Sequence, residues 1–136
     1  MGVRKLNKFS RQPMSDATVK YTIIFNDPEL DHEERDEEVD KLLPQIRELE
    51  DVVVARVKDP NPPAGNKSLG GFLVGVLTAE VNAANAKQAF EFLRDRLGGK
   101  TIELEVEGNG KKLKVSASNR ADLEAAIQQA QAFIAA

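Results

Sequence analysis

The chain has 136 residues, a formal net charge of -3 and no cysteine. This length suits one domain with its own core, and the acidic balance disfavours non-specific binding to nucleic acid, which needs a basic surface. Without cysteine there is no disulfide framework and no thiolate nucleophile, and we expect a cytoplasmic protein. Aromatic residues make up only 5% of the chain, so aliphatic side chains must fill the core.

The first sixteen residues differ from the rest of the chain. They are basic up to Asp16 and lack the apolar stretch of a secretory signal. We expect residues 1–16 to form a disordered basic tail, or an added extension ahead of a natural start at Met14. Residues 17–136 are then expected to form a single domain.

A strand and a helix are predicted next. Residues 18–25 alternate between apolar and polar side chains, which is typical of a half-buried strand. Asp31 and Glu34 have the spacing of a capping box and indicate the start of a helix, whose apolar positions repeat through Leu49. Pro44 lies inside this pattern, so we expect the helix to be kinked or split there.

Three further segments complete the first half of the domain. Residues 52–57 are mostly β-branched and apolar on both faces, which indicates an interior strand. Residues 61–66 contain adjacent prolines and predict an extended connector. Residues 68–77 are apolar and rich in glycine, but they are too short to cross a bilayer, since a spanning helix needs about 20 apolar residues. We interpret residues 69–81 as one or two buried helical turns before a helix that ends at Gly98 and Gly99.

The last part of the chain predicts a hairpin and a helix. Residues 102–117 alternate between aliphatic and charged side chains around Gly108-Asn109-Gly110, so the glutamates and lysines oppose each other on one solvated face. A closing helix begins at Ser118 or Asn119. We therefore predict an α+β fold, a two-layer sandwich in which three helices cover one face of a four-stranded mixed sheet. The first two strands are expected to be joined by a parallel crossover connection.

Few residues are candidates for a catalytic or metal-binding site. His32 is the only histidine, and it lies between acidic residues near a helix start, where we expect it to be exposed. Asp27, Glu29 and Asp31 approximate the spacing of a calcium loop, but His32 stands where that loop requires glycine. These acids are weak metal candidates, and their position at a helix N-terminus accounts for them. We predict that the chain is not an enzyme and needs no cofactor.

Several stretches together resemble one family. They include Leu-Glu-Asp-Val-Val (49–53), Leu-Gly-Gly-Phe-Leu-Val-Gly-Val-Leu (69–77), Phe-Leu-Arg-Asp-Arg-Leu (92–97) and Ile-Glu-Leu-Glu-Val-Glu-Gly (102–108). With the proline-rich connector and the final helix, this succession resembles the effector-associated constant component family, small bacterial domains of modular conflict or immunity systems. The resemblance implies an adaptor that couples a sensing or NTP-driven component to an effector, without catalysis of its own.

Two functions remain open after the sequence analysis. The first is an interaction domain whose partners are proteins, such as a peptidase effector, an NTPase component or a second copy of the chain, and neither nucleic acid nor a membrane. The second is a sensor of a small molecule or a divalent metal that uses the acidic helix start. For the first function, the candidate partner-binding residues are Gly70, Gly71, Val74, Gly75, Arg94 and Arg96.

Overall fold

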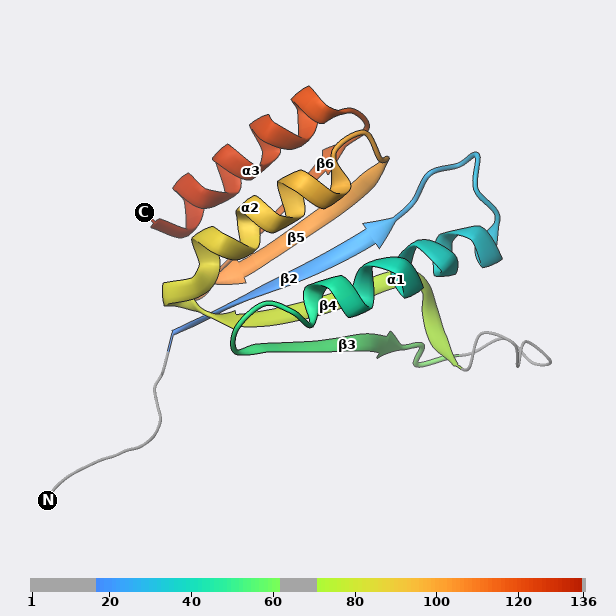
Figure 1. Ribbon diagram of the computed structural model, residues 1–136, viewed down its shortest axis with the longest axis horizontal. Coiled ribbons are helices and arrows are strands. Elements are labelled where there is room, and N and C mark those ends of the chain that lie inside the picture. The colour runs from blue at the N-terminus through green and yellow to red at the C-terminus, as the bar shows by residue number, and fades with distance from the viewer. Residues whose placement is uncertain (1–16, 62–70, 136) are drawn as a thin grey trace, which may run out of the picture.

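The sheet has one strand more than the sequence predicts. The computed structural model describes residues 17–61 and 71–135, and within them five antiparallel strands form one sheet in the order β3-β4-β2-β5-β6 (Figure 1). The strands are β2 (Thr18–Phe25), β3 (Val52–Lys58), β4 (Phe72–Asn82), β5 (Ile102–Gly108) and β6 (Lys111–Ala117). The α+β class is confirmed, but the prediction of four strands in a mixed sheet is wrong. The predicted tail, residues 1–16, lies outside the described residues.

β4 is the strand that the sequence analysis misses. Residues 72–81 of the segment that we interpret from sequence as helical form all but the last residue of this strand, which pairs with β2 on one side and β3 on the other, so the helical interpretation is wrong. Both faces of β4 are apolar near its centre, since Leu77 is fully buried and Val76 is 9% exposed. An apolar run without alternation looks the same in a buried helix and in an interior strand, which explains the error.

The position of β4 also changes the predicted crossover. β2 and β3 each pair antiparallel with β4, so they run in the same direction, but they are not neighbours. The helix that connects them, α1 (His32–Ile46), packs mainly on β4, which lies between them. β3 is therefore an edge strand, and the prediction that it is interior is wrong. Its β-branched composition is that of a strand with neighbours on both sides.

Side-chain caps begin the first and last helices as their sequences predict. Asp31 Oδ1 accepts from the Glu34 backbone N–H at 2.8 Å, and Glu34 Oε1 accepts from the Asp31 N–H at 2.9 Å, so the predicted capping box is present. α1 continues through Pro44 to Ile46 and is not split. Asn119 begins α3 (Arg120–Ala135), where its Oδ1 accepts from the Asp122 N–H at 2.8 Å.

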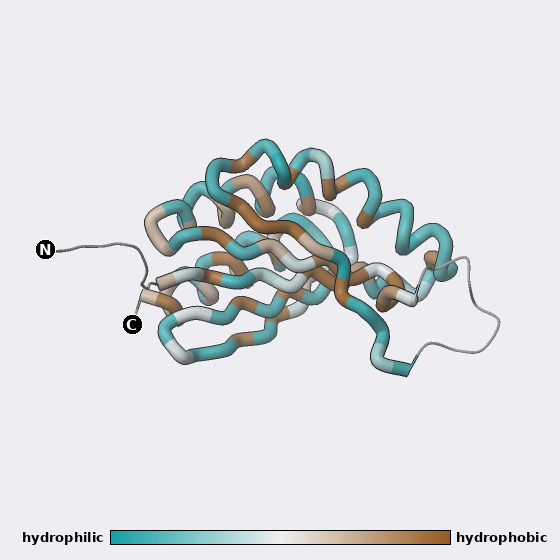
Figure 2. The backbone as a smooth tube through the Cα atoms, turned by 90° about the horizontal axis from the view of Figure 1, so that it is seen from below, coloured by the Kyte–Doolittle hydropathy of each residue, from teal (hydrophilic) through white to brown (hydrophobic). Residues whose placement is uncertain are grey.

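All the described helices lie on one face of the sheet, as predicted. In Figure 1, α1, α2 (Ala86–Leu97) and α3 lie in front of the strands, and the turned view of Figure 2 shows helices on one side and strands on the other. A short 3-10 helix, Ala83–Asn85, joins β4 to α2. The other face of the sheet carries no helix from the described ranges.

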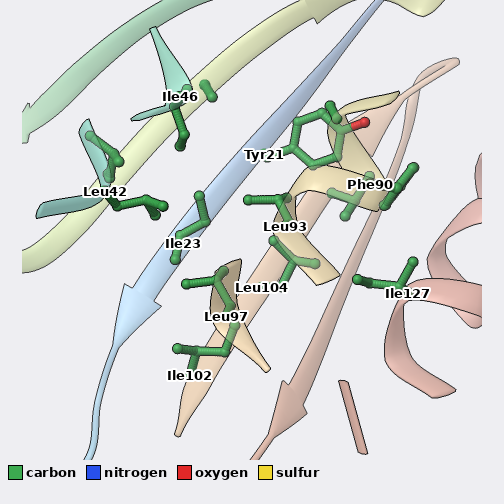
Figure 3. Close-up of a cluster of buried hydrophobic side chains, with 14 of the residues drawn as sticks. Tyr21, Ile23, Leu42, Ile46, Phe90, Leu93, Leu97, Ile102, Leu104 and Ile127 are labelled. Atoms are coloured by element: carbon green, nitrogen blue, oxygen red, sulfur yellow. The ribbon is translucent and has the colours of Figure 1, made fainter. Parts of the chain in front are cut away.

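The core fills the space between these two layers. Figure 3 shows its side chains, which come from β2, β5 and all three helices. Tyr21 lies at its centre, 1% exposed, with its ring edge-to-face on Phe90 at 5.0 Å between centroids and 79° between planes. Such aromatic pairs add about 1 kcal/mol beyond the burial of their area. The core thus holds α2 against β2. The opposite face of the sheet takes no part in this packing.

Candidate protein-interaction surface

The acidic residues that resemble a calcium loop are used in local structure. Asp27 Oδ1 accepts from the Glu29 backbone N–H at 2.9 Å, and Asp31 belongs to the capping box. His32, the first residue of α1, is exposed. Across residues 17–61 and 71–135, no group of three or more histidine or acidic side chains is placed to hold a metal ion. The hydrogen bonds of Asp27 and Asp31 account for their positions near the helix start.

The candidate glycines have different environments. Gly70 lies outside the described residues, and Val74 is half-buried in β4. Gly71 has φ +78, and a Cβ there would meet nothing within 4 Å. Gly75 is buried with φ +70, and a Cβ there would lie only 2.9 Å from the carbonyl oxygen of Phe25. Gly75 therefore allows close packing within the chain, in a conformation that glycine adopts readily.

An ion pair that the sequence analysis misses lies beside Gly75. Arg56, from β3, places its NH2 group 2.7 Å from Asp36 Oδ1 on α1. The same oxygen accepts from the Gly75 backbone N–H at 2.8 Å. The Arg56 guanidinium also donates to the Leu73 carbonyl oxygen at 3.2 Å and lies 5.5 Å from the centroid of the Phe72 ring. This cluster holds α1, β3 and β4 together.

Two signals in the sequence point to this cluster. Arg56 interrupts a β-branched strand, and Asp36 lies three residues before the buried Val39, on the apolar side of α1. Each is a charged residue in an apolar pattern, and such residues are buried only when they are paired. The pairing itself spans 20 positions, so local periodicity does not predict it.

Arg94 and Arg96 lie in the last turn of α2, where both are exposed. The Arg96 guanidinium lies 5.1 Å from the centroid of the Phe92 ring and borders a shallow hollow of about 160 Å³ between α1 and α2. A Lys100–Glu38 ion pair of 2.7 Å crosses this hollow. The two predicted sets of partner-binding residues do not form one patch, because Gly75 is buried against α1 whereas these arginines are on the surface of α2.

The sheet face opposite the helices is charged over β5 and β6. Lys114 Nζ lies 3.4 Å from Glu103 Oε1 and 3.7 Å from Glu105 Oε2 across the hairpin. Asn109 and Gly110 form the turn with φ values of 54° and 71°, as a two-residue hairpin loop of this twist requires. The predicted ladder of opposed glutamates and lysines is confirmed. It explains how this half of the face is exposed to water without a covering layer.

The same face is uncharged over parts of β2, β3 and β4. Thr78 pairs with Thr22 on one side and Ala55 on the other, and Ile24 pairs with Val76. Directly opposed residues share a face, and none of these side chains belongs to the core cluster beneath the helices. Together with a neighbour on β3, they form what we call the neutral patch: Thr22, Ile24, Val53, Ala55, Val76 and Thr78.

Val53 completes this patch at the sheet edge. Val53 is 68% exposed, and among the described residues it is the only large hydrophobic residue that is mainly exposed to solvent. It belongs to β3, whereas the opposite edge strand, β6, carries Lys111, Lys112 and Lys114. Lysines on an edge strand discourage pairing with another sheet. The two edges of the sheet therefore differ sharply in how they are protected.

Tyr21 is the one group among the described residues with a clearly shifted pKa. Burial raises the pKa of its phenol above the ordinary value. Its hydroxyl donates to the Ala86 carbonyl oxygen at 3.0 Å, at the start of α2. Shifted pKa values often mark functional sites, but this side chain is inside the core, and its hydrogen bond has a structural role.

Comparison with known proteins identifies no relative. No family model, no curated protein and no solved structure matches this chain. None of the helices in the described ranges is long and apolar enough to cross a bilayer. Functional interpretation therefore depends on the surfaces described above.

Proposed function

We propose that this chain is a non-catalytic protein-interaction domain, an adaptor that couples a sensing or NTP-driven component to an effector in a bacterial conflict system. The observation that supports it is the neutral patch on the uncovered face of the sheet. The assignment to a conflict system rests on the sequence resemblance alone. The proposal requires that a protein partner covers this patch.

The chemistry of the patch favours burial by a partner. Its side chains are mostly β-branched and lose little rotamer freedom when they are covered. The Thr78 hydroxyl already donates to the Ala55 carbonyl oxygen at 3.1 Å, so covering it leaves no unpaired donor. The adjacent glutamates and lysines supply alternating charges, which orient a partner more than they strengthen its binding.

Purified proteins provide the test. The chain is tested for binding to the products of neighbouring genes, and Thr22→Arg is compared with Ser116→Arg. Thr22 lies inside the neutral patch, whereas Ser116 is exposed on β6, and both changes add the same charge. We expect Thr22→Arg to weaken binding at least about tenfold, because it places a long charged side chain inside the contact, where removing it from water is costly. Ser116→Arg should leave binding unchanged.

Two results would contradict the proposal. Binding that both variants retain equally would place the contact elsewhere, and no binding to any tested component would remove the support for an adaptor. The competing hypothesis is the sensor. A rise in melting temperature with Ca²⁺, Mg²⁺ or a nucleotide, lost in Asp27→Asn, would favour it, because a ligand selective for the native state stabilises that state.

A further inference from the structure

The outer edge of β3 has no protection of the usual kind between Val52 and Ala55. This stretch contains no charge and no proline, and Val53 is 68% exposed. Sheet edges are commonly blunted by lysines, bulges or prolines, because an open edge pairs with other strands. On β3 the first such features come later, at a register shift between Arg56 and Lys58 and at Pro60.

The backbone of β3 also has hydrogen-bonding groups that point toward the open edge of the sheet. The Thr78 hydroxyl of β4 donates to the Ala55 carbonyl oxygen, so the backbone groups of Ala55 face β4. Successive residues of an antiparallel strand direct these groups to opposite sides. The N–H and C=O of Val54 therefore face away from β4, where no described strand lies.

Charge selects the direction of a pairing strand. Glu50 and Asp51 precede β3, and Lys58 ends it. A parallel copy of this segment would place like charges together, which is destabilising. An antiparallel copy brings the acidic end of one segment to the basic end of the other.

The register shift selects the alignment. It limits the regular part of β3 to residues 52–56, whose midpoint is Val54. An antiparallel pair centred on Val54 sets Val53 opposite Ala55 of the second copy. Opposed residues then come from the same sheet face, so the helices of both copies lie on the same side of a continuous sheet.

We propose that the chain forms a two-fold symmetric dimer in which β3 pairs antiparallel with β3 of a second copy about an axis at Val54. This contact covers the exposed Val53 side chain and satisfies the outward backbone groups of Val54. A two-fold axis uses the same patch on both copies. The inference goes beyond the proposed function and does not depend on it, since a dimer forms whether or not another protein binds the chain.

Disulfide trapping tests the alignment. The natural chain contains no cysteine, so any disulfide must join the cysteines that are introduced. Val53→Cys and Ala55→Cys are made as separate proteins, mixed and oxidised. The proposed register places these cysteines directly opposite each other in a mixed dimer, so a disulfide between the two variants should predominate. Each variant alone places its two cysteines diagonally, about 7 Å or more apart, which disfavours the bond. A disulfide that forms best in either variant alone would overturn the register.

Sedimentation equilibrium over a range of concentrations tests the dimer. We expect Val53→Lys to raise the dimer Kd at least about tenfold, because each copy contributes one added charge to the contact. Ser116→Lys, with the same charge on the opposite edge strand, should leave the Kd unchanged, and circular dichroism verifies that both variants are folded. A chain that is monomeric throughout, or equal effects of the two variants, would overturn the inference. A monomer that binds a protein partner through the neutral patch would still satisfy the proposed function.

Discussion

The Asp36 carboxylate joins Arg56 to a backbone N–H through one oxygen atom. Oδ1 lies 2.7 Å from Arg56 NH2 and accepts from the Gly75 N–H at 2.8 Å. The two charged side chains are only 13% and 18% exposed. This contact connects α1, β3 and β4 on the helix side of the sheet, directly beneath the neutral patch.

Asp36→Ala should lower the free energy of unfolding by about 3 kcal/mol. The change leaves the Arg56 charge partly buried without its closest partner and removes the acceptor of the Gly75 N–H. Asp40→Ala is the matched control on the same helix, because Asp40 is 73% exposed and lies 4.0 Å from Arg56. We expect that control to change stability by at most about 0.5 kcal/mol. Urea denaturation measures both values. Equal losses in the free energy of unfolding would show that the buried pair contributes no more to stability than the exposed one.

Gly75→Ala should destabilise the fold more than Gly71→Ala. Both glycines have positive φ, so both substitutions carry a backbone cost of about 1 to 2 kcal/mol. Only at position 75 does the new Cβ also meet a backbone atom, the Phe25 oxygen at 2.9 Å. The difference in free energy of unfolding between the two variants isolates this steric contact, and we expect at least about 1 kcal/mol. If Gly71→Ala lowers the free energy of unfolding as much as Gly75→Ala, the close contact of Gly75 with the Phe25 oxygen does not limit the side chain at position 75.

Pro44→Ala should stabilise α1. The helix continues through Pro44 to Ile46, so alanine there restores a backbone donor within the last turn. Inside a helix, proline costs about 3 kcal/mol relative to alanine. Part of this cost, up to about 1 kcal/mol, is offset because proline lowers the conformational entropy of the unfolded chain. We expect a net gain of about 2 kcal/mol, while Lys41→Ala on the same exposed side changes little. Thermal unfolding of the two variants gives the comparison, and a loss of stability in Pro44→Ala would contradict it.

The elements predicted correctly from sequence are those that local residues determine. The capping box of Asp31 and Glu34 and the turn at Asn109 and Gly110 involve residues at most three positions apart. Their hydrogen bonds and φ angles depend little on the rest of the fold. The alternation of Glu and Lys then sets which face of the hairpin is exposed to water.

The errors concern pairings between distant segments. Residues 72–77 have no alternation, because both faces of β4 carry apolar side chains: Leu77 lies in the core, and Val76 lies in the neutral patch on the other face. β3 has the composition of an interior strand and yet lies at an edge, since β4 enters the sheet between it and β2. The ion pair of Asp36 and Arg56 also depends on the position of β4 between β3 and β2. Sequence periodicity reports burial and does not identify the neighbour that causes it.

Tyr21 provides a prediction for alkaline pH. Burial raises the pKa of its phenol in the folded chain, whereas the unfolded chain has the ordinary value of about 10. The neutral phenol therefore contributes its full stability below pH of about 10, and this contribution is lost as the pH rises from there toward the folded pKa. We expect the folded protein to lose stability in this alkaline range and the phenolate to appear mainly on unfolding.

The chain makes this measurement simple, since it has one tyrosine and no tryptophan. Phenolate absorbance near 295 nm then reports Tyr21 alone, and circular dichroism reports unfolding in the same samples. Tyr21→Phe is the control: it removes the hydrogen bond to the Ala86 oxygen, at a cost of about 1 kcal/mol near neutral pH, and it also removes this titration. Its stability should fall less steeply above pH of about 10 than that of the parent chain. A phenolate that titrates near pH 10 while the circular dichroism stays native would show that the ring is open to water, contrary to its position between β2 and α2.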